Sequence, residues 1–133
     1  NMLHESQFQN AGVRPLNAYI NAASDEDPQL LLDESIATRY ANAIHVVNRD
    51  DPCSVCNCFT SAYGRSHVRS GSYLQTQNGI RRFAPSEILR LMGFPPTFSL
   101  PSNISSRKAW ELIGNSVSVD AVQHVLANFA HRR

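Results

Sequence analysis

The sequence predicts an α+β fold, and three observations support this prediction. Residues 44–47 are rich in β-branched side chains, which is typical of a β-strand. Pro85 and Gly93 stand where a helix begins and ends, respectively. Near the C-terminus, four apolar residues have the spacing of one helical face, namely Val122, Val125, Leu126 and Phe129. A helix with such a stripe must bury it against another part of the protein.

The N-terminal half predicts short elements separated by turns. Residues 1–12 are expected to be loosely ordered, and residues 14–23 to form a short helix. Residues 24–28 are acidic and end in proline, which predicts an exposed loop. A second short helix is expected over residues 33–40. Residues 58–76 mix strand formers with glycines and predict short strands and loops.

The C-terminal third contains the clearer helix signals. Pro85 suits a first helical turn, where its missing N–H costs nothing. Glu87 can reach back to the N–H of Ala84, but alanine has no side-chain acceptor, so only half of a capping box is expected. Gly93 ends this helix. The next helix is expected over residues 105–114, with a serine as its cap and a glycine at its end.

The composition excludes several classes of protein. No apolar run is long enough to span a bilayer, and no signal peptide is visible at the start of the sequence. The three cysteines, Cys53, Cys56 and Cys58, are an odd number, which argues against a disulfide framework and fits a reducing compartment. A cytoplasmic or nuclear location is therefore predicted.

Charge is unevenly distributed along the chain. Residues 1–60 hold three arginines and eight carboxylates, a net charge of −5, whereas residues 61–133 carry +6. A basic second half could face a polyanion such as a nucleic acid. The alternative is a solvated basic surface that balances an acidic one.

Two C-terminal segments carry the most specific signal. They are Gly114-Asn115-Ser116-Val117 and, before it, the segment 85–95 with its Pro-Ser-Glu start and Gly-Phe-Pro end. Read alone, the first segment is a turn with a polar cap. In this order and spacing, however, the two segments resemble the last two conserved motifs of the carbon-5 cytosine methyltransferases.

A third stretch narrows the resemblance. Residues 58–76 contain Cys-Phe-Thr, then Tyr-Gly, Gly-Ser and Leu-Gln-Thr, and are similar to the target-recognition region of the tRNA-aspartate cytosine-38 methyltransferases. This chain differs in having only Gln77-Asn78-Gly79 between that region and the next segment, and Asn-Gly is a tight-turn signal.

The resemblance implies the C-terminal portion of an S-adenosylmethionine-dependent tRNA (cytosine-5) methyltransferase. It divides the chain into a partly disordered N-terminal segment (1–29), a target-recognition region (30–79) and C-terminal helices (80–133). Those helices would pack on a Rossmann-like methyltransferase domain. The expected cofactor contacts are Asn115, Ser116 and Val117. The expected substrate contacts are Cys58, Phe59, Thr60, Tyr63, Arg65 and Arg69, with His67 beside them. The arginines would bind phosphates, and the tyrosine would stack on a splayed base.

Carbon-5 methylation of cytosine needs a thiolate that adds to carbon 6, and it needs the base to be flipped out of its stack. The family supplies the thiolate from a Pro-Cys-Gln loop, grips the ring with Glu-Asn-Val and holds the cofactor on a Gly-rich loop. None of these segments occurs here, and Pro52-Cys53 is followed by serine. No catalytic residue is therefore assigned. The chain alone is predicted to be inactive and to need an N-terminal catalytic half as its partner.

Other interpretations remain open. Cys53, Cys56 and Cys58 with His45 or His67 could bind zinc, but no second Cys-x-x-Cys knuckle is present, so no metal is expected. The chain could instead be a fragment of a DNA cytosine-5 methyltransferase. A third interpretation is a non-catalytic binding or regulatory subunit that completes a separate catalytic chain.

Overall fold

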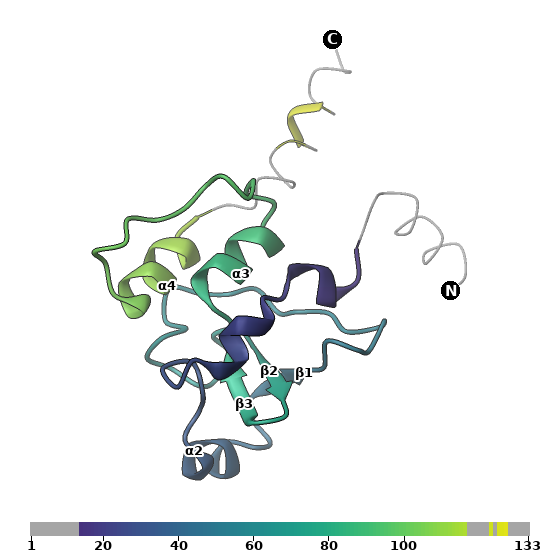
Figure 1. Cartoon of the computed structure of the whole chain (residues 1–133), viewed down its shortest axis with the longest axis vertical. Helices are drawn as coiled ribbons and strands as arrows, with labels where there is room; N and C mark the ends of the chain where they lie inside the picture. The colour runs from purple at the N-terminus through teal and green to yellow at the C-terminus, as the bar shows by residue number, and fades with distance from the viewer. Residues whose placement is uncertain (1–13, 117–122, 124, 128–133) are drawn as a thin grey trace.

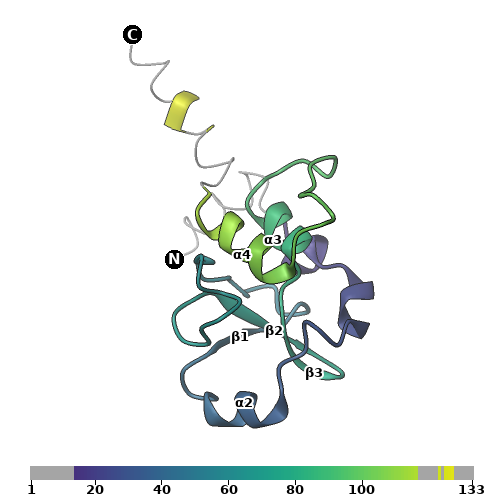
Figure 2. The ribbon, with the colours of Figure 1, turned by 90° about the vertical axis from the view of Figure 1, so that its left-hand side faces the viewer.

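The computed structural model describes residues 14–116, 123 and 125–127. In chain order the elements are η1 (Leu16–Tyr19), η2 (Ala22–Glu26), α2 (Glu34–Arg39), β1 (His45–Val47), β2 (Ser72–Thr76), β3 (Gly79–Arg82), α3 (Pro85–Leu91) and α4 (Ser106–Gly114), where η marks a 3₁₀ helix. Helices α3 and α4 lie together at one end of the sheet, and α2 lies at the opposite end (Figures 1 and 2). The described residues thus form the predicted mixture of helices and strands.

The sheet has the order β1-β2-β3, with β1 parallel to β2 and β2 antiparallel to β3. Thr76 pairs with Gly79, so the β2–β3 hairpin turns through Gln77 and Asn78, as the Asn-Gly signal predicts. Because β1 and β2 are parallel, the chain must cross over between them. Residues 48–71, which we call the crossover loop, make that connection and carry the Cys-Phe-Thr segment.

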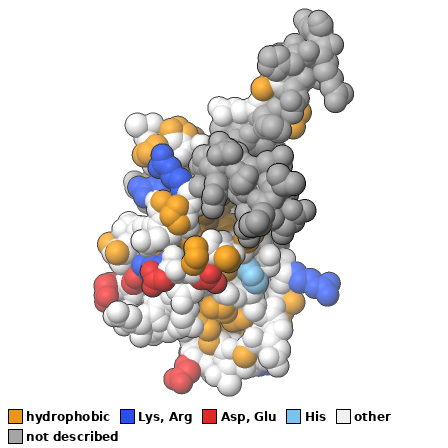
Figure 3. Space-filling view, turned by 90° about the vertical axis from the view of Figure 1, so that its right-hand side faces the viewer, with side chains coloured by type: hydrophobic (Ala, Val, Ile, Leu, Met, Phe, Trp, Pro, Cys, Tyr) orange, Lys and Arg blue, Asp and Glu red, His pale blue; other side chains and the backbone are white. Residues whose placement is uncertain are grey.

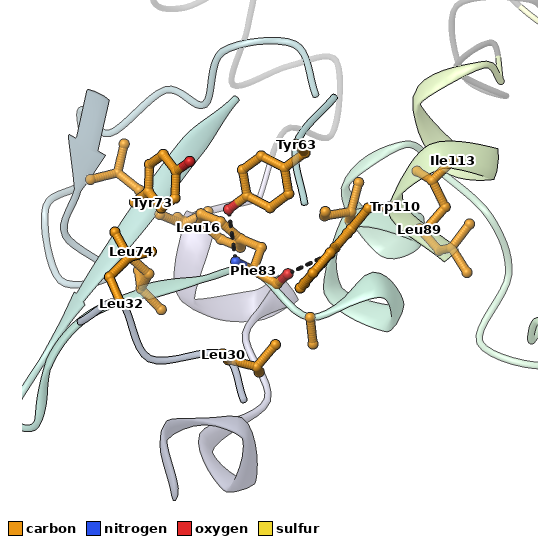
Figure 4. Packing of buried hydrophobic residues seen from close by; sticks show 13 residues of the cluster. Leu16, Leu30, Leu32, Tyr63, Tyr73, Leu74, Phe83, Leu89, Trp110 and Ile113 are labelled. Carbon is orange, nitrogen blue, oxygen red and sulfur yellow. Dashed lines mark hydrogen bonds between the residues drawn. The ribbon is translucent and has the colours of Figure 1, made fainter. Parts of the chain in front are cut away.

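One hydrophobic core joins the crossover loop, the sheet and the helices. Figure 4 shows Tyr63 and Trp110 each joined to the backbone of Phe83 by a hydrogen bond. The Tyr63 hydroxyl accepts a hydrogen bond from the Phe83 N–H at 2.9 Å, and Trp110 Nε1 donates to the Phe83 carbonyl at 3.0 Å. The core includes Leu16 from the N-terminal segment as well as residues from both later regions. The functional division at residues 29 and 79 stays a prediction.

A buried ion pair lies beside this core. Arg81 and Glu87 are each 1% exposed and form a two-pronged contact at 2.8 and 2.9 Å. The Glu87 carboxylate also accepts hydrogen bonds from the backbone N–H groups of Asn21 at 2.8 Å and Ala84 at 2.7 Å. Arg81 Nε donates to Asp25 at 2.8 Å. This network ties η2, β3 and α3 together.

The predicted helix signals are confirmed. The Asp33 carboxylate caps α2 by accepting from the Ser35 N–H, and the Ser105 hydroxyl caps α4 by accepting from the Lys108 N–H. Glu87 supplies the expected half of a capping box, because its carboxylate accepts from the N–H of Ala84. Gly93 follows α3 with a φ of 89°, the left-handed conformation that glycine adopts at helix ends.

The expectation of one helix over residues 14–23 is wrong. The backbone is extended at Ile20 and Asn21, which separates η1 from η2. The reason is tertiary: the N–H of Asn21 is used by Glu87, and its side chain caps η2 at Ala23. The expected exposed acidic loop is also wrong in part, since Asp25 is half-buried. Burial raises the pKa of Asp25, but hydrogen bonds from Arg49 and Arg81 outweigh this effect and lower it overall.

Two sequence predictions fall largely outside the described residues. These are the loose order of residues 1–12 and the apolar stripe that includes Val122 and Phe129. Val125 and Leu126, the two members of the stripe that the structure describes, are 63% and 61% exposed. Within the described ranges, no helix has the length and apolar character needed to cross a membrane.

Candidate functional site

The crossover loop touches the end of α4 at Gly114. A Cβ atom on Gly114 would lie 2.1 Å from the backbone nitrogen of Ser61 and 2.3 Å from the carbonyl carbon of Thr60. Backbone therefore meets backbone at this point, and only glycine fits. We call the segments 58–61 and 114–116 together the motif junction. It brings the Cys-Phe-Thr segment and the Gly-Asn-Ser segment, which are distant in sequence, into contact.

A second glycine helps to position the loop side of the motif junction. Gly71 has a φ of +150°, and a Cβ there would lie 2.6 Å from the Phe59 ring. Phe59 packs edge-on against Tyr63 and Phe83, with ring centroids at 5.0 and 5.5 Å. The Thr60 N–H donates to the Ser70 carbonyl at 2.8 Å. The loop backbone beside α4 is thus held from both sides.

The expected cofactor residues follow α4 directly. Asn115 and Ser116 are both exposed. The Ser116 hydroxyl donates to the Leu112 carbonyl at 3.0 Å, which leaves its lone pairs for another donor. In the part of the chain that the structure describes, the Asn115 side chain has no hydrogen-bond partner, so its donors and its acceptor are available to a ligand. Val117 lies outside the described residues.

The expected substrate residues are placed differently from one another. Cys58, Arg65 and Arg69 are exposed, whereas Phe59 and Thr60 are half-buried at the motif junction. Arg69 has a φ of 56°, in the left-handed region that costs an L-residue about 1–2 kcal/mol. An exposed arginine in that conformation is a candidate for a binding role, since backbone strain concentrates at functional sites.

Tyr63 requires a correction. Its side chain is 0% exposed, and its ring is enclosed by Phe59, Tyr73 and Trp110. Its hydroxyl accepts from the Phe83 N–H and donates to the Ser72 carbonyl, and burial raises the pKa of Tyr63 well above the usual value. The expectation that Tyr63 stacks on a substrate base is therefore wrong, because no face of the ring is accessible.

The three cysteines have separate surroundings. Cys53 and Cys58 are exposed, and Cys56 is half-buried. Burial raises the pKa of the Cys56 thiol to about 11, against the lowering effect of a hydrogen bond with Ser72. The Ser72 hydroxyl also lies 2.7 Å from Nδ1 of His45. Among the described residues, no three side chains of His, Cys, Asp or Glu are grouped as metal ligands.

The arginines fall into two groups. Arg49 and Arg81 pair with carboxylates of the buried network. Within the described ranges, the other arginines pair with no carboxylate, and they include Arg39, Arg65, Arg69 and Arg82. Figure 3, which views one side of the molecule, shows acidic side chains across the middle and at the lower edge, and basic side chains above them, beside them and to the right. The unpaired arginines make the crossover loop and its neighbours the candidate polyanion surface.

Sequence reasoning missed three members of that surface as site residues, namely Arg39, Tyr40 and Arg82. Arg82 lies with its Cζ 5.7 Å from the Trp110 ring, and its Nη2 lies 3.5 Å from Nδ1 of His67. Burial, and then the nearby Arg82 charge, lowers the pKa of His67. The ring of Tyr40 lies 5.4 Å from that of His67. Alternation of basic and aromatic residues across separate elements has no short-range sequence signal, so only the fold reveals it.

Comparison with known families gives a match over almost the whole chain. The model of the family described as C-5 cytosine-specific DNA methylase matches residues 3–131. Among curated relatives, the tRNA (cytosine(38)-C(5))-methyltransferase of Homo sapiens is 28% identical over 90% of this chain. The enzyme of the same name from Spodoptera frugiperda is 32% identical over 67% of this chain. A DNA (cytosine-5)-methyltransferase of Dictyostelium discoideum is 33% identical over 53%.

Solved structures agree with the fold. The crystal structure of the S. pombe Dnmt2 methyltransferase matches with a TM-score of 0.76 at 24% identity over 90% of this chain. A mutant of Spodoptera frugiperda DNMT2 matches with a TM-score of 0.75 at 25% identity over 86%. This chain spans less than half of each relative: 37% of the human protein, 27% of the S. frugiperda protein and 42% of the S. pombe structure.

Proposed function

The chain belongs to the C-5 cytosine-specific DNA methylase family, and on that premise we propose that it is the C-terminal portion of an S-adenosylmethionine-dependent tRNA (cytosine-5) methyltransferase. In this proposal it supplies substrate recognition and one wall of the cofactor pocket. An N-terminal half supplies the nucleophile and the rest of that pocket. The chain alone is inactive, and the whole protein works in the cytoplasm or the nucleus.

The motif junction is the observation that carries this proposal. A portion that serves both substrate and cofactor must hold its recognition segment and its cofactor segment in a fixed relation. The contact of Gly114 with Thr60 and Ser61 does so through backbone, with no flexible side chain between the segments. S-adenosylmethionine would supply the methyl group. The free amide of Asn115 and the lone pairs of Ser116 suit the polar groups of such a cofactor.

The choice of tRNA over DNA is supported by curated relatives that match 86% to 90% of this chain and are named tRNA (cytosine(38)-C(5))-methyltransferases. The alternative substrate is DNA, because the Dictyostelium relative is named a DNA (cytosine-5)-methyltransferase. The exposed Cys58 and the half-buried Phe59 and Thr60 are the proposed recognition residues on the loop side of the motif junction.

The deciding experiment measures methyl transfer from labelled S-adenosylmethionine by the full-length polypeptide, with tRNA and duplex DNA as competing substrates. We expect tRNA to be labelled and this chain alone to label neither. Preferential labelling of DNA would replace the proposed substrate with its alternative. If a separate catalytic chain becomes active only when this chain is added, the result would instead favour the non-catalytic subunit that completes it. Activity of this chain alone, lost in Cys53→Ala, would overturn the assignment of the nucleophile to another half.

Substrate affinity should depend on Arg65 and Arg69. Replacing both with alanine in the full-length protein should weaken tRNA binding about tenfold. The slope of log affinity against log salt concentration should become shallower by about 1–2, because one or two phosphate contacts are lost. Cofactor affinity should not change. The lysine double variant is the matched control, because it keeps both charges. Unchanged tRNA affinity in the alanine double variant would remove this loop from the substrate surface.

Arg69 permits a further control within the same experiment. Its φ of 56° suits glycine without steric cost, so Arg69→Gly should bind tRNA more weakly yet be no less stable. A structural role for Arg69 predicts the opposite pattern, with lower stability and unchanged affinity.

Cofactor affinity should depend on Asn115. Its amide offers both donors and an acceptor and lacks a partner among the described residues, so Asn115→Ala should leave the free energy of unfolding nearly unchanged. Loss of a polar contact in a binding site costs about 1–3 kcal/mol, so the Kd for S-adenosylmethionine should rise about tenfold or more. Calorimetric titration of the full-length protein measures this. A lowered melting temperature with wild-type affinity would assign Asn115 to the turn alone.

A further inference from the structure

Four side chains from three separate parts of the fold form one row. Arg39 and Tyr40 lie at the end of α2, with Arg39 Cζ 5.5 Å from the Tyr40 ring centroid. The Tyr40 ring lies 5.4 Å from the ring of His67, which belongs to the crossover loop. His67 Nδ1 lies 3.5 Å from Nη2 of Arg82 on β3. We call Arg39, Tyr40, His67 and Arg82 the arginine–aromatic row.

The composition of this row indicates an anionic, aromatic ligand. Arg39 and Arg82 pair with no carboxylate among the described residues, in contrast to Arg49 and Arg81 in the buried network. Their charges are therefore not neutralised within that part of the chain. Guanidinium groups bind phosphates through charged hydrogen bonds, and a base can stack on the flat rings.

The position of the row suits a substrate that also reaches Arg65 and Arg69. His67 lies between these two arginines in the chain, so the row shares the crossover loop with the proposed phosphate contacts. Arg82 lies over Trp110 of α4, the helix that ends at the motif junction. The row therefore extends the candidate surface from α4 towards α2, at the far end of the sheet (Figure 2).

We propose that the arginine–aromatic row binds an unpaired nucleotide of a single-stranded RNA segment, with its base on the accessible part of the Tyr40 ring and its phosphates at Arg39 and Arg82. Tyr40 is half-buried and held by His67, so the ring is already fixed for stacking. Bases inside a duplex have no free face for this contact, which favours an unpaired strand. This inference rests on the proposed function, since it takes RNA to be the substrate.

The test compares two substitutions of Tyr40 in the full-length protein. A short labelled single-stranded RNA and the duplex of the same sequence serve as probes, and anisotropy gives the two affinities. We expect Tyr40→Leu to weaken single-strand binding about tenfold. Tyr40→Phe keeps the ring and should bind as the wild type does. Duplex affinity should change little in either variant.

Variants of Arg39 test the same row in case Tyr40→Leu does not fold. Arg39 is exposed at the end of α2, so Arg39→Gln should fold normally and still weaken single-strand binding, while Arg39→Lys should keep most of it. If the wild type binds no RNA, the proposed function fails. If the wild type binds RNA, and Tyr40→Leu and Arg39→Gln bind it equally well, only the arginine–aromatic row is excluded. If Tyr40→Leu and Arg39→Gln weaken binding of a protein partner but leave RNA affinity unchanged, this inference is likewise overturned.

Discussion

Replacing Glu87 with glutamine should lower the free energy of unfolding by about 3–5 kcal/mol, the effect of breaking a buried ion pair. Glu87 and Arg81 are each 1% exposed, so Arg81 would remain buried with Asp25 as its only charged partner. The new amide would also turn donors towards the donors of Arg81. Urea unfolding of the full-length protein, followed by circular dichroism, measures the change.

The matched control is Glu111→Gln, which makes the same substitution in the exposed Lys108–Glu111 ion pair of α4. Glu111 and Lys108 are 47% and 53% exposed and lie 3.5 Å apart, so this change should cost less than about 1 kcal/mol. Equal effects of the two substitutions would contradict the role of burial in the Arg81–Glu87 pair.

An apolar replacement of the whole pair should not restore stability. Buried ion pairs can often be exchanged for apolar side chains of similar volume at little cost. Here, however, Glu87 also accepts the N–H groups of Asn21 and Ala84, which would lose their acceptor in Arg81→Met/Glu87→Leu. The Ala84 N–H is buried, and an orphaned buried donor costs about 1–3 kcal/mol, whereas the part-buried Asn21 N–H should cost less. Recovery of wild-type stability in this double variant would show that these backbone contacts matter little.

Local signals predicted the fold where a residue acts on its own neighbours in the chain. Asp33 and Ser105 cap helices through side-chain contacts two or three residues away, and Gly93 ends α3 through its own backbone conformation. The Asn-Gly signal likewise places the β2–β3 turn. In each case the physical cause lies inside a window of a few residues, so the sequence contains it.

The failures involve contacts between distant segments. The helix expected over residues 14–23 breaks because Glu87 takes the N–H of Asn21. Tyr63 was expected at the substrate because it lies in the segment that resembles the target-recognition region, yet the fold encloses its ring between Phe59 and Trp110. A short window around Asn21 does not contain Glu87, and one around Tyr63 contains Phe59 but not Trp110.

The candidate site shows the same difference between local signals and long-range contacts. The motifs themselves are linear, so the family resemblance could be read from residues 58–76, 85–95 and 114–117, and the family match confirms it. Their contact is not linear. Nothing in the Gly-Asn-Ser segment specifies that its glycine meets Thr60 and Ser61, and the arginine–aromatic row likewise depends on how α2 and β3 approach the crossover loop.

Replacing Gly114 with alanine should therefore be severe, although the same exchange in an exposed helix stabilises by up to about 1 kcal/mol. The added Cβ would lie 2.1 Å from the Ser61 nitrogen and 2.3 Å from the Thr60 carbonyl carbon. Both are backbone atoms held by the Thr60 to Ser70 hydrogen bond, so no side-chain rotation relieves the clash. We expect the free energy of unfolding to fall by about 3 kcal/mol, at the upper end of overpacking effects.

The variant should also separate the two halves of the motif junction, and this second effect distinguishes a functional contact from simple packing. Under conditions where Gly114→Ala remains folded, affinities for both S-adenosylmethionine and tRNA should fall, because the Asn115 turn and the Cys58 segment move apart. Lys108→Ala is the control: it lies on the exposed face of the same helix and should change stability by no more than about 0.5 kcal/mol. Denaturation and titration of both variants in the full-length protein measure these effects. A stabilised Gly114→Ala protein would show that the loop yields to the new methyl group, and the motif junction would then not be the rigid link on which the proposed function depends.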